Sequence, residues 1–242
     1  MAETSRLHSL PLFPLGTVLF PGGQLSLRVF EVRYLDMVRK CESTGAPFGV
    51  VALQSGHEVR KAGADPDQLF AHGVLAHIES LETVQAGLLQ LQCQGSQRFH
   101  ILSSWQLPHG LWVADVEMLA ADMPTPIPPH LLNIAHALFQ VLMNMQDPVH
   151  PLPTPSQMND CGWVANRWAE LLPLPVKIKQ QLMVLDSALL RLELVADVLE
   201  QNGLGKASPP GSANGARWPT RVKWAASVTA SSSPPQIVPS VP

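Results

Sequence analysis

The histidines and cysteines of this sequence are its candidate metal ligands. His72 and His77 lie five residues apart in a segment with strand-like alternation, so their side chains point to opposite faces. His130 and His136 lie six residues apart in a helical pattern, and no cysteine pair completes a zinc set beside them. The spacing therefore predicts no metal site.

The sequence also offers little for catalysis or nucleotide binding. Gly203-Leu204-Gly205-Lys206 is a faint match to a phosphate loop, because the upstream glycine and the Ser or Thr after the lysine are missing. Cys41 falls in a predicted helix, where cysteine is most often a small buried apolar residue. We therefore predict no catalytic residue and no cofactor. A cofactor-free hydrolase stays open as an alternative, because a nucleophile and its base can meet in space without a signature spacing.

Any site must be positioned by the stretch from Leu10 to Tyr34, around which the chain is organised. It opens with two short apolar runs that three prolines punctuate. Proline fixes φ and removes a backbone donor, so these runs predict edge or bent strands. Pro21-Gly22-Gly23 predicts a tight turn, because glycine accepts positive φ at little steric cost.

After this turn the apolar period changes from two to three or four residues. Alternation from Leu25 to Val29 predicts a half-buried strand. From Phe30 the helical spacing predicts a helix over residues 31–43, in which Phe30 and Tyr34 belong to the core. Gly45 and the proline that follows end this helix.

Further short alternating segments predict that the sheet continues to about residue 119. The segments are Phe48–Leu53, a partner around Val59, Val74–Val84, Leu89–Cys93, Phe99–Ile101 and Trp112–Leu119. Six or so short strands with one early helix predict an α+β fold whose N-terminal part is a small curled sheet or open barrel.

A proline-rich segment from Met123 to Pro129 marks a change of composition. We place a β-rich domain at residues 1–122 and an α-helical bundle subdomain at residues 123–202. Beyond Pro175, apolar residues from Ile178 to Leu199 alternate spacings of four and three and predict one long helix. Coiled coils show the same spacing, so a helical dimer is an alternative. Extra apolar residues widen the stripe beyond a coiled-coil seam and favour a core helix in a monomer or weak dimer.

Residues 203–242 form a basic tail rich in Ser, Pro, Gly and Ala, with no acidic residue. This composition predicts disorder, because it buries too little apolar surface to offset the entropy of ordering. Trp218 and Trp224 lie among its basic residues, either as a short docking element or as incidental residues of a solvated end.

Composition and charge narrow the classes of partner. The net charge is −3, which gives no reason to expect nucleic acid as a partner. The sequence contains no run of 18 apolar residues, so we expect no membrane span. The first residues lack the apolar region of a secretory signal. Three cysteines far apart suit a reducing compartment, so we expect a cytoplasmic protein.

Several motifs together carry a resemblance to one family. They are Leu10-Pro11-Leu12-Phe13-Pro14-Leu15, Leu19-Phe20-Pro21-Gly22, Leu27-Arg28-Val29-Phe30-Glu31 with Arg33-Tyr34, Phe48-Gly49-Val50-Val51, Gln97-Arg98-Phe99, Leu171-Leu172-Pro173-Leu174-Pro175 and Arg191-Leu192-Glu193-Leu194. With them the chain resembles the Lon substrate-binding (N-terminal) domain family, over roughly residues 8–200. The resemblance implies a PUA-like fold. It also implies a peptidase S16-like family label without the ATPase and peptidase domains, so we expect neither ATP hydrolysis nor peptide cleavage.

The function that the resemblance implies is non-catalytic recognition of polypeptides, with unfolded or damaged proteins as clients in protein quality control. Because PUA-like folds also bind RNA, an RNA-binding protein is an alternative that the acidic charge argues against. Candidate residues for peptide binding, or for a purely structural motif, are Pro21, Gly22, Arg28, Phe30, Glu31, Arg33 and Tyr34. For Arg28, Glu31 and Arg33 the structural alternative is a charge network that joins the strand to the helix.

Overall fold

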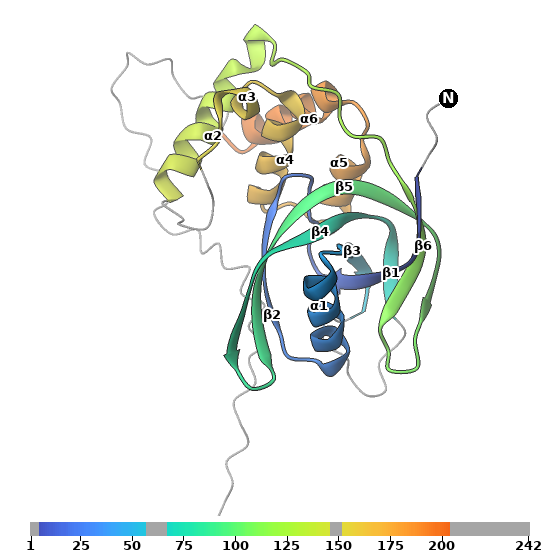
Figure 1. Ribbon diagram of the computed structural model, residues 1–242. Helices are drawn as coiled ribbons and strands as arrows, with labels where there is room; N and C mark the ends of the chain where they lie inside the picture. The colour runs from blue at the N-terminus through green and yellow to red at the C-terminus, as the bar shows by residue number, and fades with distance from the viewer. Residues whose placement is uncertain (1–4, 57–66, 146–151, 204–242) are drawn as a thin grey trace, which may run out of the picture. The chain divides into compact units, whose positions relative to one another are not determined.

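The first part of the chain is a strongly bent sheet that carries one helix (Figure 1). The computed structural model describes residues 5–56, 67–145 and 152–203. The strands are β1 (Arg6–Leu15), β2 (Gln24–Val29), β3 (Phe48–Ser55), β4 (Gln68–Gln85), β5 (Leu88–Gln106) and β6 (Trp112–Met118). Helix α1 (Val32–Thr44) connects β2 to β3.

The sheet closes on itself through β6. The strand order is β2-β5-β4-β3-β1-β6, and β6 also pairs with β5, so β1, β3, β4, β5 and β6 form a ring. Only β1 and β3 run parallel among the pairs of these strands. Strand β5, with 19 residues, pairs successively with β2, β4 and β6, and shifts of register let it bend around the ring.

Glycines let the Pro21–Gly23 turn lie directly on β5. Gly22 adopts φ +73°, its amide donates to the carbonyl of Gly95 at 2.8 Å, and the amide of Gly95 donates to the carbonyl of Gly23 at 2.8 Å. A Cβ atom on Gly95 would lie 2.4 Å from the carbonyl oxygen of Phe20. The absence of a side chain at residue 95 therefore permits this close approach of two backbones.

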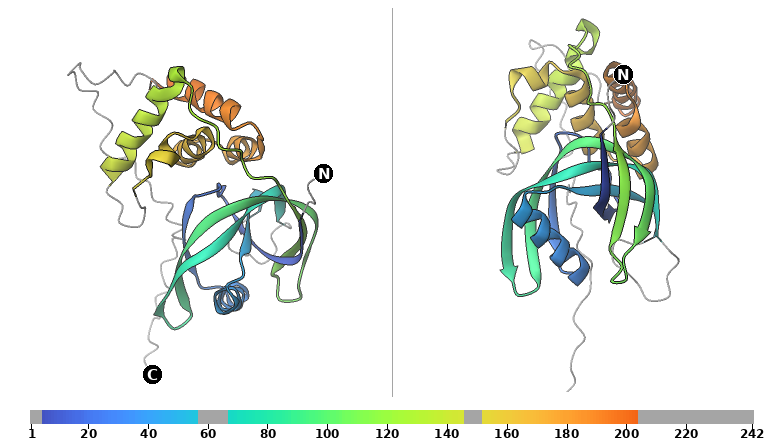
Figure 2. Two further views of the ribbon diagram at one scale, coloured as in Figure 1. Left: turned by 45° about the horizontal axis from the view of Figure 1, so that its top comes forward. Right: turned by 45° about the vertical axis from the view of Figure 1, so that its right-hand side comes forward.

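Helices make up the second part of the chain. They are the 3-10 helix η1 (Pro129–Leu131) and helices α2 (Leu132–Met145), α3 (Pro155–Met158), α4 (Cys161–Leu171), α5 (Val176–Val184) and α6 (Ala188–Gln201). Figures 1 and 2 show these helices gathered together on one side of the sheet, with α1 on the sheet's other side. None of the helices within the described ranges is long and apolar enough to cross a bilayer.

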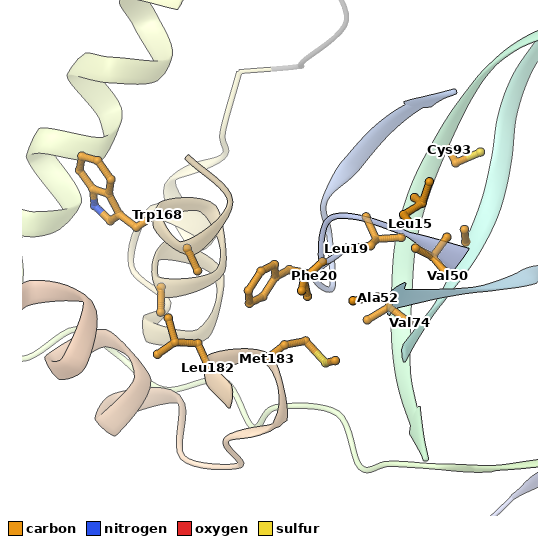
Figure 3. Packing of buried hydrophobic residues seen from close by; sticks show 14 of the residues in the cluster. Leu15, Leu19, Phe20, Val50, Ala52, Val74, Cys93, Trp168, Leu182 and Met183 are labelled. Atoms are coloured by element: carbon orange, nitrogen blue, oxygen red, sulfur yellow. The ribbon is translucent and has the colours of Figure 1, made fainter. Parts of the chain in front are cut away.

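Two apolar clusters hold these elements together. The smaller lies inside the ring of strands, around Leu12, Leu75 and Phe99. The larger cluster extends from α1 through the segment Val18–Phe20 into the helices. Figure 3 shows Leu19 and Phe20 between the helices that carry Trp168, Leu182 and Met183 and the strands that carry Val50, Ala52, Val74 and Cys93. The described residues all belong to one compact unit, residues 1–210.

The mixed α+β class and the curled sheet predicted from the sequence are confirmed. The prediction of edge or bent strands for the opening proline-punctuated runs holds for the first run and was wrong for the second. The first run is the strand β1, which pairs with both β3 and β6 and is therefore not an edge strand, and its register shifts between Leu7 and Leu10. The second, from Val18 to Phe20, is a buried connection and not a strand. Alternation and proline content do not distinguish a strand from an extended segment whose side chains fill a core.

The prediction of one helix from Pro175 to Leu199 was also wrong, because α5 ends at Val184 and α6 begins at Ala188. Ser187 caps α6 by accepting a hydrogen bond from the amide of Leu190 at 3.2 Å. Serine is a strong N-cap signal that the apolar periodicity concealed. The predicted strand around Val59 and the predicted disordered tail from Leu204 onward, with both its tryptophans, lie outside the described residues.

Candidate functional site

The candidate residues predicted from the opening stretch do not form one site. Pro21 and Gly22 lie against α4, where Arg167 donates hydrogen bonds to the carbonyl of Pro21 at 3.0 Å and to that of Gly22. The guanidinium of Arg167 also lies over the ring of Trp163, 5.6 Å from its centroid. This part of the predicted motif therefore attaches the sheet to the helices.

Glu31, Arg33 and Tyr34 form a second, separate attachment. Arg33 is buried, pairs with Glu31 at 3.0 Å and donates to the carbonyl of Gly110 at 2.8 Å. Tyr34 stacks on Phe13 with 4.2 Å between ring centroids. The contacts of Arg33 attach the start of α1 to Gly110, which lies between β5 and β6, whereas the charge-network alternative had these residues join the preceding strand to the helix.

Arg28 and Phe30 are exposed and take no part in that network. Arg28 lies on the outer face of β2 and makes no ion pair with any residue in the described ranges. The side chain of Phe30 is 49% exposed, which corrects the expectation that it belongs to the core. Helix α1 begins at Val32 and Glu31 is its N-cap, so Phe30 lies outside the helix. The helical spacing that placed Phe30 in the core therefore does not include this residue.

Burial and charge at Arg167 change the titration of its partner Glu170. The two side chains pair at 3.0 Å, and Lys179 donates to the backbone carbonyl of Glu170 at 2.8 Å. Burial raises the pKa of Glu170 to about 7, although Arg167 and the amide of Phe20 act in the opposite direction. Burial likewise lowers the pKa of Arg167. The carboxyl group therefore changes its protonation near neutral pH.

Two buried arginines join β5, the segment between β6 and η1, and α6. Arg98 pairs with Asp122 at 3.1 Å, and Arg191 pairs with the same carboxylate at 2.6 Å. The two arginines also donate to backbone carbonyls where α5 ends, namely Leu182, Met183 and Leu185. They therefore satisfy the terminal carbonyls of α5 and fix the break between α5 and α6.

A groove runs beside these contacts, where the sheet meets the helices. One hollow of about 460 Å³ is lined by Pro21, Gly22, Ser96, Gln97, Arg98, Ala121, Asp122, Asp160, Gly162, Trp163 and Asn166. A neighbouring hollow of about 400 Å³ shares Asp122, Asp160 and Trp163. Asp160 is the N-cap of α4 and accepts from the amides of Trp163 and Thr125, so its charge is already engaged by the fold. What the groove offers a ligand is a concave surface beside an indole.

Helix α2 presents an apolar face to solvent. Its 14 residues include no charged side chain. Ile134, Ala135 and Leu138 face inward, and the indole of Trp168 in α4 donates to the carbonyl of Ile134 at 3.0 Å. On the opposite side Leu132, Phe139 and Met143 are each between 37% and 42% exposed, with the exposed polar residues His136 and Gln140 beside them. We call Leu132, Phe139 and Met143 the α2 face. Figure 2 shows α2 at the periphery of the helices.

The α2 face was not predicted from the sequence. The signal was present, because a soluble helix usually carries charges opposite its apolar stripe and this one carries none.

Histidine and cysteine side chains do not form a reactive group among the described residues. No set of three or more His, Cys, Asp or Glu side chains there could hold a metal ion. Cys41, Cys93 and Cys161 are buried, and burial raises the pKa of each thiol, that of Cys93 to about 12. A thiol with a raised pKa is a poor nucleophile. One histidine contact was not foreseen, since His72 of β4 meets His100 of β5 and not His77.

Comparison with known proteins identifies the family to which the chain is similar. Residues 9–201 match the family model described as the ATP-dependent protease La (LON) substrate-binding domain. Among curated proteins, the chain is 28% identical over 211 residues to Lon protease 2 of Herpetosiphon aurantiacus, covering 83% of this chain and 24% of that protein. It is 23% identical over 202 residues to the Lon protease of Brevibacillus choshinensis, covering 82% and 26%. The chain thus spans about a quarter of the length of these relatives.

Solved structures agree with the family match. A Lon N-terminal domain protein from Xanthomonas campestris is 32% identical, with a TM-score of 0.62, over 79% of this chain and 98% of that one. The N-terminal domain of the Mycobacterium avium complex Lon protease is 20% identical, with a TM-score of 0.51, over 78% and 96%, and supports the fold alone.

Proposed function

The chain belongs to the LON substrate-binding domain family, and from this premise we propose that it binds unfolded polypeptides without cleaving them. The match is to the substrate-binding domain only, so nothing in the matched region corresponds to the ATPase or peptidase parts of the relatives. The proposed role is to hold or select a client polypeptide.

The observation that carries this proposal is the α2 face. Unfolded chains expose apolar side chains that folded proteins bury, and a helix face without Asp, Glu, Lys or Arg can receive them without desolvating one of these ions. One of the three residues, Met143, is a methionine, whose unbranched side chain adapts to partners of different shape. This chemistry suits a binder of many sequences better than a binder of one.

A second contact is proposed at Phe30, the exposed aromatic among the residues predicted from the sequence. Val32, two residues on, is 73% exposed and adds apolar area beside it. The groove beside Trp163 offers a third surface, where an extended segment could place an aromatic side chain against the indole.

Binding of a fluorescently labelled, reduced and carboxymethylated lactalbumin tests the proposal. We expect the double substitution Phe139→Ser and Met143→Ser to weaken binding at least fivefold, because it removes two of the three side chains of the α2 face. Val84→Ser is the matched control, since Val84 is 51% exposed on β4, away from the helices. Equal binding by the double variant and the wild type, or equal weakening in the Val84→Ser control, would exclude the α2 face as the site.

A further inference from the structure

His72 and His100 form a contact between neighbouring strands. They are direct partners in the β4–β5 register, and Nε2 of His72 lies 3.2 Å from Nδ1 of His100. The rings are 4.6 Å apart between centroids and tilted by 42°. Both side chains are half-buried. A nitrogen–nitrogen hydrogen bond of this kind needs one N–H and one lone pair, so at least one ring must be neutral.

This pair lies where α5 attaches to the sheet. The amide of Gln180 in α5 donates to the backbone carbonyl of His72 at 2.9 Å. Two residues from His100, on the same face of β5, Arg98 donates to the carbonyl of Met183 in α5 at 3.0 Å. The strands that carry the two histidines therefore also hold α5.

Charges of both signs lie around the pair. Arg98 faces it from β5 and is itself paired with Asp122 and Asp186. Lys177 of α5 and Asp186 line an adjoining hollow of about 500 Å³ together with Phe70 and Gln180. Asp186, which follows α5, is an opposing negative charge, but its side chain is 93% exposed. Burial, His100 and Arg98 lower the pKa of His72, and Asp186 offsets this effect only in part.

We propose that the His72–His100 pair makes the attachment of α5 to the sheet dependent on pH, firm at neutral pH and loosened under mildly acidic conditions. A second proton on the pair would turn two N–H groups toward each other beside Arg98. When α5 separates from β4, His72 becomes solvated and binds a proton more readily than in the attached state. Protons therefore favour the detached state as the pH falls below about 6.5, the ordinary value for histidine, and each unit of pKa difference shifts the equilibrium tenfold.

Hydrogen exchange of the full chain tests this proposal. Exchange rates in α5 and in α1 are compared at pH 7.5 and pH 5.5 after correction for the intrinsic pH dependence. In the wild type we expect protection of α5 to fall severalfold relative to α1, and by no more than about tenfold, because a single histidine with an ordinary pKa near 6.5 in the detached state can supply no more over this range. The double substitution His72→Gln and His100→Gln should abolish this fall, because glutamine stays neutral. His77→Gln, at an exposed histidine on β4 that contacts Ser96, should behave as the wild type.

Two results would overturn the proposal. One is equal relative protection of α5 at both pH values in the wild type. The other is a fall in the double variant as large as in the wild type. If the double variant does not fold, His100→Gln alone removes the second charge of the pair and is held to the same two outcomes.

Discussion

Arg191 is the most deeply buried of the charged side chains in the described structure, with 1% of its surface exposed. Its guanidinium serves four acceptors from three segments, which are Asp122, Asn166 and the carbonyls of Leu182 and Leu185. Breaking a buried ion pair costs about 3–5 kcal/mol, because the remaining partners lose their hydrogen bonds without gaining water.

We therefore expect Arg191→Met to lower the free energy of unfolding by about 3–5 kcal/mol in urea titration. The control is Arg6→Met, since Arg6 makes an exposed pair with Glu117 and its loss should cost less than about 1 kcal/mol. Equal losses in the two variants would contradict a structural role for Arg191.

Glu170 gives stability a pH dependence of its own. Its pKa is about 7 in the folded chain and about 4.5 unfolded, so the folded state binds the proton more tightly. This contribution is fully present below pH 4.5 and is lost as the pH rises to about 7. One pKa unit is worth about 1.4 kcal/mol. Because the side chain keeps 24% of its surface exposed, we expect solvent screening to leave about 1–2 kcal/mol.

Glu170→Gln should remove this slope, so that the variant gains stability relative to the wild type between pH 5 and pH 8. Urea unfolding at the two pH values measures the difference. An unchanged slope would mean that Arg167 keeps the carboxyl group ionised throughout.

Phe30 and Tyr34 are expected to respond differently to truncation. Phe30→Ala should cost less than about 1 kcal/mol, as is usual for exposed positions. Tyr34→Ala should cost about 3–5 kcal/mol, because its ring is buried and stacked on Phe13. A loss above 2 kcal/mol for Phe30→Ala would show that its ring is buried in solution.

At the scale of elements, the close contact between the Pro21–Gly23 turn and β5 leaves no room for a side chain at residue 95. Gly95→Ala should destabilise the chain by about 1–3 kcal/mol, because the new Cβ would lie 2.4 Å from a backbone oxygen that the turn holds in place. Gln94→Ala, at the exposed neighbouring position, should change stability by less than about 0.5 kcal/mol. Thermal unfolding of both variants checks this, and equal midpoints would contradict so close a contact.

Most elements could be predicted from the sequence, because period and capping residues are local signals. Gly45 ends α1 as expected, in the left-handed conformation at φ 66°. The connections between elements could not be predicted. The pairing of His72 with His100 depends on a register, and the double use of Asp122 by Arg98 and Arg191 depends on the packing of three segments. The exposure of Phe30 follows from where a helix begins, which period alone does not locate to one residue.

At the scale of the molecule, the sheet and the helices share one apolar cluster. Phe20, fully buried, lies among residues contributed by both parts. We therefore expect residues 1–122 alone to lack a cooperative thermal transition, because this surface would be exposed. Residues 1–203 serve as the control and should unfold within about 2 °C of the full chain, less than the loss of 1 kcal/mol would cause in a domain of this size. A sharp transition in the short fragment would show that the sheet folds independently.

The closure of the strand ring through β1 and β6 also matters while the chain is being made. Arg6 and Glu117 are partners across this seam although 111 residues separate them. Ribosomes add about 5–20 residues per second, so β1 waits roughly 6–22 s for the strand that completes its pairing. During that time the apolar side chains of Leu10 and Leu12 are on a nascent chain whose seam cannot yet close. Within this sheet, the strand that is synthesised first is thus among the last to be fully paired.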